Sequence, residues 1–157
     1  MSNADLEPVV LVITVLVLLY LAFADLHSFQ IRNELVLALI GLWLVDITVT
    51  GRWSSAYGNI GFAAFMLIVM AYFYHRQWMG GGDVKLAAVA FLWTGIDCAL
   101  VFALFLLGFA VMHAAAAKLG WVGVRHSDSG AMRIALAPSI AAALISAFLL
   151  GCLGAGA

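Results

Sequence analysis

The chain has 157 residues, of which 66% are hydrophobic and only 10% charged, and its formal net charge is −1. A soluble domain of this length could not bury so much apolar surface, so the composition predicts an integral membrane protein. The near-neutral charge provides no electrostatic field for nucleic acid, which excludes that class of partner.

Five apolar runs approach the roughly 20 residues that a helix needs to cross about 30 Å of hydrocarbon. In chain order they are Val9–Ala24, Leu35–Val49, Tyr57–Tyr74, Cys98–Leu119 and Ile134–Leu153. A sixth run, Val84–Trp93, is too short to span alone, and Thr94-Gly95-Ile96-Asp97 separates it from the next run as a tight turn. We therefore predict an all-α integral membrane protein, a bundle of six transmembrane helices with the fourth short, forming a single domain over residues 1–157.

Basic residues predict how this bundle is oriented, because Lys and Arg collect on the cytoplasmic side of a membrane. With six spans, only Arg52 falls on one side. The other side holds Arg32, Arg76, Lys85, Lys118, Arg125 and Arg133. We expect a multi-pass protein of the inner (plasma) membrane, in contact with its lipid, with both termini extracytoplasmic.

Two aspartates lie at the predicted cytoplasmic ends of spans. Asp25 closes the first apolar run, and Asp83 follows Gly80-Gly81-Gly82 where the chain re-enters hydrocarbon. An acid at this depth is costly unless it has a use. Two carboxyl groups that share one proton can activate water and protonate a carbonyl or a leaving nitrogen without metal or cofactor. We therefore expect a catalytic pair that hydrolyses a peptide bond.

The three glycines beside Asp83 have a related interpretation. Because glycine has no Cβ, these positions can adopt positive φ and let a substrate backbone approach closely. A flexible connector with a solvated acid is the alternative, but it does not account for Asp25.

These motifs resemble the type IV prepilin peptidase family of GxGD membrane aspartyl proteases. Gly80-x-Gly82-Asp83 is followed by Val84-Lys85-Leu86 and a short apolar helix, and Asp25-Leu26 is followed by Ile31 and Asn33. The last span contains Ala137-Pro138-Ser139-Ile140. The resemblance is strongest to the short branch associated with Tad/Flp pili.

The resemblance implies that Asp25 and Asp83 are the catalytic aspartates, and that the glycine loop helps to place the substrate. The implied substrate is a pilin or pseudopilin precursor, with a basic leader and a hydrophobic helix, cleaved at the cytoplasmic face. The chain lacks the cysteine tetrad of full-length members, so the resemblance leaves open whether it methylates the new amino terminus. Arg32 stands where the family often has proline.

Two other functions fit parts of the pattern. An archaeal-type preflagellin peptidase shares the aspartate pair. A small proton- or cation-coupled transport subunit would also use acids in the membrane, but such acids usually lie near the midplane on broken helices.

Two polar residues near the aspartates have alternative roles. Lys85 could hold a carboxylate ionised or anchor the substrate, or it could extend its ammonium to the lipid headgroups. We expect Asn33 to cap the second predicted helix, with a hydrogen bond toward Asp25 as the alternative. Both are candidate substrate-binding residues.

The remaining polar residues are expected to be structural. We interpret His113 as a neutral histidine bonded to a neighbouring helix, without a metal role. Asp46 and Asp97 are expected to face water or cap helix ends. Cys98 and Cys152 form no CxxC pair, so we predict small packing residues rather than a disulfide or a zinc site.

Overall fold

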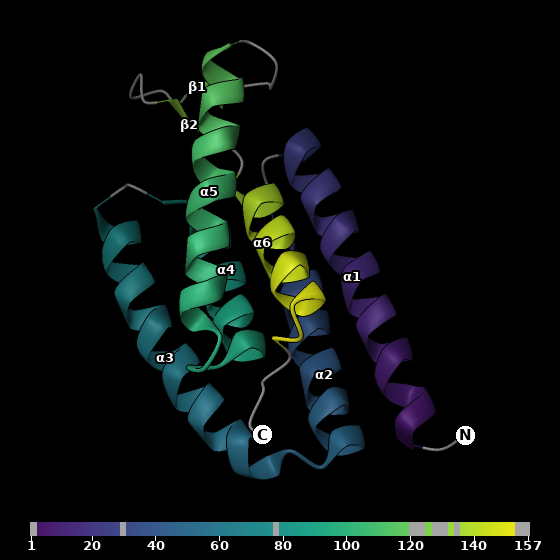
Figure 1. Cartoon of the computed structure of the whole chain (residues 1–157). Helices are drawn as coiled ribbons and strands as arrows, with labels where there is room; N and C mark the ends of the chain where they lie inside the picture. The colour runs from purple at the N-terminus through teal and green to yellow at the C-terminus, as the bar shows by residue number, and fades with distance from the viewer. Residues whose placement is uncertain are drawn as a thin grey trace.

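The computed structural model describes residues 3–28, 31–76, 79–119, 125–126, 132–133 and 136–152, and these form a helical bundle (Figure 1). The helices are α1 (Asn3–Ser28), α2 (Asn33–Thr50), α3 (Trp53–His75), α4 (Gly81–Thr94), α5 (Ala99–Lys118) and α6 (Ala137–Leu149). Two strands of two residues each, β1 (Arg125–His126) and β2 (Met132–Arg133), pair antiparallel. The predicted helical class is confirmed.

Four of these helices, α1, α2, α3 and α5, are long and apolar enough to cross a membrane. The structure thus supports four spans by length, where the sequence predicted six. The predicted fourth helix is short, and Gly95, at φ 62°, ends it at the expected turn. The last helix is shorter than the predicted run Ile134–Leu153, because Pro138 lies in its first turn and Gly151, at φ 79°, follows its end.

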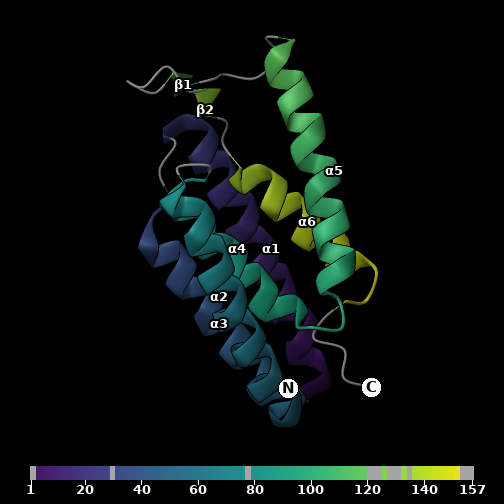
Figure 2. The same cartoon turned by 90° about the vertical axis from the view of Figure 1, so that its left-hand side faces the viewer.

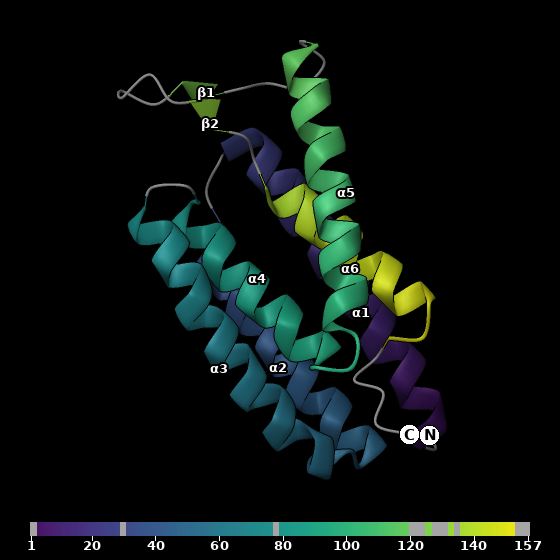
Figure 3. The ribbon, with the colours of Figure 1, turned by 60° about the vertical axis from the view of Figure 1, so that its left-hand side comes forward.

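The short helix α4 is the centre of the bundle. It packs against α2, α3, α5 and α6 (Figures 2 and 3), and every residue from Leu86 to Thr94 is buried. Phe91 makes edge-to-face contacts with Phe62 of α3 and Phe102 of α5. On the remaining side, the indole N–H of Trp93 donates to the Leu39 carbonyl of α2. The lipid-facing apolar surface belongs mainly to the four long helices.

Successive helices run in alternate directions, which gives the bundle two distinct ends (Figure 1). One end carries the α1–α2 and α3–α4 connections, the last turn of α5 and the start of α6, and we call it the basic end. Arg32, Arg76, Lys85 and Lys118 lie there, whereas Arg52 lies in the α2–α3 connection at the opposite end. The charge asymmetry predicted from the sequence is therefore a property of the folded bundle.

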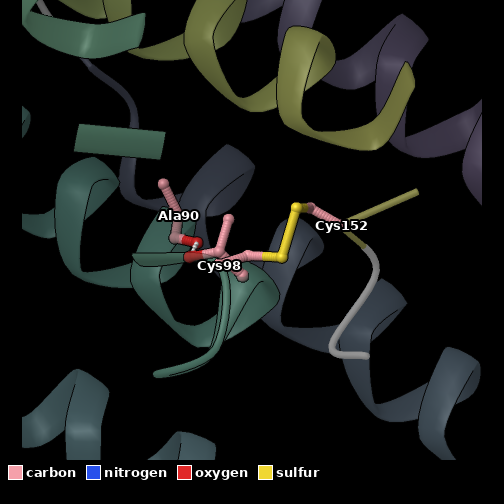
Figure 4. The surroundings of a disulfide bond; sticks show 4 residues. Ala90, Cys98 and Cys152 are labelled. Atoms are coloured by element: carbon pink, nitrogen blue, oxygen red, sulfur yellow. Dashed lines mark hydrogen bonds between the residues drawn. A yellow bond between two sulfur atoms is a disulfide. The ribbon is translucent and has the colours of Figure 1, made fainter. Parts of the chain in front are cut away.

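The prediction that the cysteines are unpaired packing residues is wrong. Cys98 and Cys152 form a disulfide, with their Cα atoms 5.7 Å apart (Figure 4). Cys98 lies in the turn between α4 and α5, and Cys152 directly follows α6. The sequence separation of 54 residues conceals this pairing, because it is the antiparallel return of α6 along α5 that brings the two sulfurs together.

Asp46 also differs from its prediction. It is buried rather than facing water, and its Oδ2 accepts a hydrogen bond from Nη2 of Arg52 at 2.8 Å. The ion pair fastens the end of α2 to the connection that follows it. Asp97, in contrast, is exposed as expected.

We expect protein purified from membranes without reductant to contain no free thiol, because both cysteines are in the disulfide. Replacing Cys98 and Cys152 together with serine should lower the thermal midpoint, since a cross-link that closes a long loop typically contributes about 2–4 kcal/mol. Alkylation with and without reduction, followed by mass spectrometry, tests whether free thiols are present. Alkylation of both cysteines without reduction would contradict the pairing.

Candidate active site

Asp83 lies in the first turn of α4, outside the four candidate spans. Gly80 is the N-cap residue of this helix, so Asp83 stands at its third position. The carboxylate accepts a hydrogen bond from the N–H of Gly80, which is the reciprocal contact of a capping box. The side chain is therefore folded back over the glycine segment and fixed by the helix that it begins.

The glycines are needed for packing rather than for positive φ. None of Gly80, Gly81 and Gly82 has positive φ, so that part of the sequence interpretation is wrong. A Cβ on Gly80 would lie 2.9 Å from Oδ2 of Asp83, and a Cβ on Gly82 would lie 2.9 Å from Cβ of Ile31. A Cβ on Gly81 would lie 3.3 Å from the Tyr74 ring. The glycines let α4 begin close against these neighbours.

Asp25 reaches the same end of the bundle from the other direction. It lies in the last turns of α1 and is only 4% exposed. Its Oδ2 accepts a hydrogen bond at 3.3 Å from the N–H of Ala137, the first residue of α6. Each aspartate thus binds a backbone N–H at the start of a short helix, where the helix dipole favours negative charge.

The two carboxyl groups are close enough to influence each other's ionisation. Burial and, after it, the charge on nearby Asp25 raise the pKa of Asp83 to about 7, against the opposing hydrogen bond from Gly80. The structure contains no hydrogen bond between these two described carboxyl groups, so charge is what couples them. At neutral pH Asp83 is therefore near the midpoint of its titration, so its protonated form is available, and a charge on Asp25 favours that form.

A histidine near Asp25 is hydrogen-bonded to a serine of α6. His113 of α5 is hydrogen-bonded through Nδ1 to Oγ of Ser139 in α6, at 3.3 Å. It also interacts electrostatically with Asp25. The expected bond between this histidine and a neighbouring helix is confirmed, but the sequence did not show that its partner follows Ala137 by only two residues.

Lys85 and Asn33 form a second polar pair at the basic end. The Lys85 ammonium donates to Oδ1 of Asn33 at 2.9 Å, which joins the start of α4 to the start of α2. Asn33 is the first residue of α2 rather than its cap, and the N-cap residue Arg32 makes no capping hydrogen bond through its side chain. The prediction that Asn33 caps this helix is therefore wrong, because its amide is engaged by a lysine 52 residues away.

The described residues contain no group of three histidine, cysteine or acidic side chains placed to hold a metal ion. Among the described residues, the polar groups near Asp25 and Asp83 include one imidazole, one hydroxyl, the backbone N–H donors and the Lys85–Asn33 pair. This set suits acid–base chemistry on water and a carbonyl.

Comparison with known families agrees with this arrangement. A family model described as the type IV leader peptidase family matches residues 12–156. The chain belongs to this family. No curated protein and no solved structure matches it significantly. Membership makes the chain a leader-peptidase-like protease, implies prepilin-like precursors as substrates, and agrees with the apolar helices of a membrane protein.

Three contacts at this site were not predicted from the sequence. Ala137 contributes only a backbone N–H, Ser139 lies within an apolar run, and Ile31 matters because of its closeness to Gly82. The Pro138 that marks the start of α6 was the available clue to the first two, since a helix start supplies free N–H donors.

Replacing Gly82 with alanine should destabilise the leader peptidase by about 1–3 kcal/mol, because the added methyl group meets Ile31 near its backbone. It should also lower activity by displacing the first turn of α4. Gly41→Ala is the matched control, since a Cβ at that helical position meets nothing within 4 Å. Equal thermal midpoints for the two variants would contradict this packing.

Proposed function

We propose that the protein is a membrane-embedded aspartic endopeptidase of the GxGD type, with Asp25 and Asp83 as its catalytic residues. One observation carries the proposal. The two carboxyl groups converge, each accepts a hydrogen bond from a backbone N–H at a helix start, and the charge of Asp25 raises the pKa of Asp83. Two carboxyl groups with coupled ionisation are suited to activating water in a peptidase.

The proposed mechanism divides two roles between the aspartates. Asp25, ionised, takes a proton from a water molecule, and the resulting hydroxide attacks the scissile carbonyl. Asp83, in its protonated form, donates its proton to the carbonyl oxygen, which gives a tetrahedral diol. When the C–N bond of the diol breaks, Asp25 passes the proton that it took from water to the leaving nitrogen, and Asp83 takes a proton back from a hydroxyl of the diol, which becomes the new carboxyl group. The Ala137 N–H stabilises the charge on Asp25 before the reaction, and burial favours the protonated form of Asp83.

The substrate is proposed to be a type IV prepilin-like precursor, of the Flp/Tad pilin or pseudopilin kind. The segment Gly80, Gly81 and Gly82, which packs the start of α4 against its neighbours, is proposed to help place the substrate beside Asp83. Lys85 and Asn33 form an exposed polar pair next to it, available to carbonyl groups or to a carboxylate of the substrate. A basic leader would meet this end before the hydrophobic stem of the precursor.

The active site is proposed to face the cytoplasm from the inner membrane, with both termini extracytoplasmic. The basic end of the bundle supports this orientation by the positive-inside rule. The disulfide supports it independently, because it lies away from the basic end and disulfides persist in oxidising compartments.

A transport subunit explains the geometry less well. A coupled transporter needs acids along a path near the bilayer midplane, whereas both aspartates bind helix starts at the basic end. A preflagellin precursor is the second candidate substrate, because the archaeal-type preflagellin peptidase shares the pair of aspartates.

Asp25→Asn and Asp83→Asn should each abolish trimming of a co-expressed prepilin, with a loss of at least about 1,000-fold in rate. The reason is that the asparagine amide cannot exchange the proton that the replaced carboxyl group would. Leader removal is followed by gel shift and mass spectrometry. Asp97→Asn is the matched control, since Asp97 is exposed at the other end of α4. Normal trimming by either variant would overturn the proposed function, and ion flux through proteoliposomes without cleavage would favour transport.

The rate of cleavage should depend on the protonation of Asp83. Because its pKa is raised to about 7, the acid form is present below that pH and is lost above it. We expect kcat/KM to fall about tenfold per pH unit on the alkaline side. In Asp25→Asn, infrared spectroscopy should show the Asp83 pKa lowered, since the neighbouring charge is gone. A rate independent of pH up to strongly alkaline values would contradict this assignment.

A further inference from the structure

His113 is not accounted for by packing alone. Its side chain is half-buried on α5, and its Nε2 is a buried atom without a hydrogen-bond partner among the described residues. A leucine at this position would fill similar space without an unpaired imidazole nitrogen. Buried unpaired polar atoms are uncommon in native proteins, and each calls for an explanation.

The other ring nitrogen connects His113 to the site. Nδ1 is bonded to Oγ of Ser139, which is buried at the third position of α6. Ala137, at the first position of the same turn, donates its N–H to Asp25. A side chain of α5 is therefore linked to a carboxylate of α1 through a single turn of α6.

This turn needs an external anchor. Leu136, the N-cap residue of α6, has no side-chain capping hydrogen bond, and Pro138 has no N–H to contribute. Besides the Asp25–Ala137 contact itself, the contact between His113 and Ser139 is the side-chain hydrogen bond that the structure gives to this described turn. Without the His113–Ser139 bond, the position of the Ala137 N–H depends on the Asp25 contact and on apolar packing, which is less specific in direction.

We propose that His113 is a positioning residue of the active site, which acts through Ser139 to hold the first turn of α6 so that Ala137 N–H remains aimed at Asp25. The inference rests on the proposed peptidase function. Asp25 is the ionisable group that faces His113 from α1, and α6 contributes only the Ser139 hydroxyl. From α4, the ionisable residues of the first turn are Asp83 and Lys85.

Kinetics of four single variants and one double variant, His113→Leu with Ser139→Ala, test the positioning role. His113→Leu and Ser139→Ala should each lower kcat about 10- to 100-fold with little change in KM, because the substrate still binds while Asp25 is misaligned. His113→Asn, whose amide can replace Nδ1, should restore most of kcat. His113→Gln, whose amide reaches the position of Nε2, should not. The double variant should be no worse than either single variant, because both remove one contact.

Met112→Leu is the matched control, because Met112 neighbours His113 on α5 but is 61% exposed. Wild-type kcat in His113→Leu, or equal loss in His113→Asn and His113→Leu, would overturn the inference while Asp25→Asn still tests the peptidase function separately. A parallel loss of kcat and thermal stability in all variants would assign His113 a purely structural role.

A spectroscopic measurement tests the geometry without catalysis. In ¹⁵N-labelled protein in lipid nanodiscs, the amide proton of Ala137 should resonate downfield because it donates to a carboxylate. We expect an upfield shift in His113→Leu, in Ser139→Ala and in Asp25→Asn, and no shift in His113→Asn or Met112→Leu. An Ala137 resonance unchanged by His113→Leu would overturn the inference even if no prepilin were cleaved.

Discussion

The site depends on two hydrogen bonds from backbone N–H groups to carboxyl groups, each at the start of a short helix. Two acidic side chains held close together repel each other when both are ionised, and the repulsion grows as water is excluded. The Ala137 N–H offsets this for Asp25, and the Gly80 N–H offsets it in part for Asp83. Because the donors are main-chain atoms, their positions are fixed by where α6 and α4 begin.

The sequence around each helix start follows from this constraint. The glycines before Asp83 bring the start of α4 against Ile31, Tyr74 and the Asp83 carboxylate itself, at distances that a Cβ would not allow. Pro138 serves α6 differently, by favouring a helix start at the point where the free N–H of Ala137 faces Asp25. The sequences at the two helix starts are unrelated, but at each start a backbone N–H is hydrogen-bonded to an aspartate carboxyl group.

The sequence predicted the helices, the short α4 and the gathering of Asp25 and Asp83 at one end, because hydropathy and charge asymmetry are local signals. It failed where a contact joins distant segments. The Cys98–Cys152 pair, the Lys85–Asn33 bond and the closeness of Gly82 to Ile31 arise from how the helices pack. The length of α6 was overestimated because an apolar composition continues past Gly151, where positive φ ends the helix.

The burial of α4 has a consequence for how the protein tolerates different membranes. A helix of 14 residues is about 21 Å long, well short of the hydrocarbon thickness. Since Leu86 to Thr94 are buried against other helices, this stretch of α4 does not have to match the bilayer, and a change in lipid length is expected to act on the outer helices by tilting them. The proposed active site is in this way separated from hydrophobic mismatch.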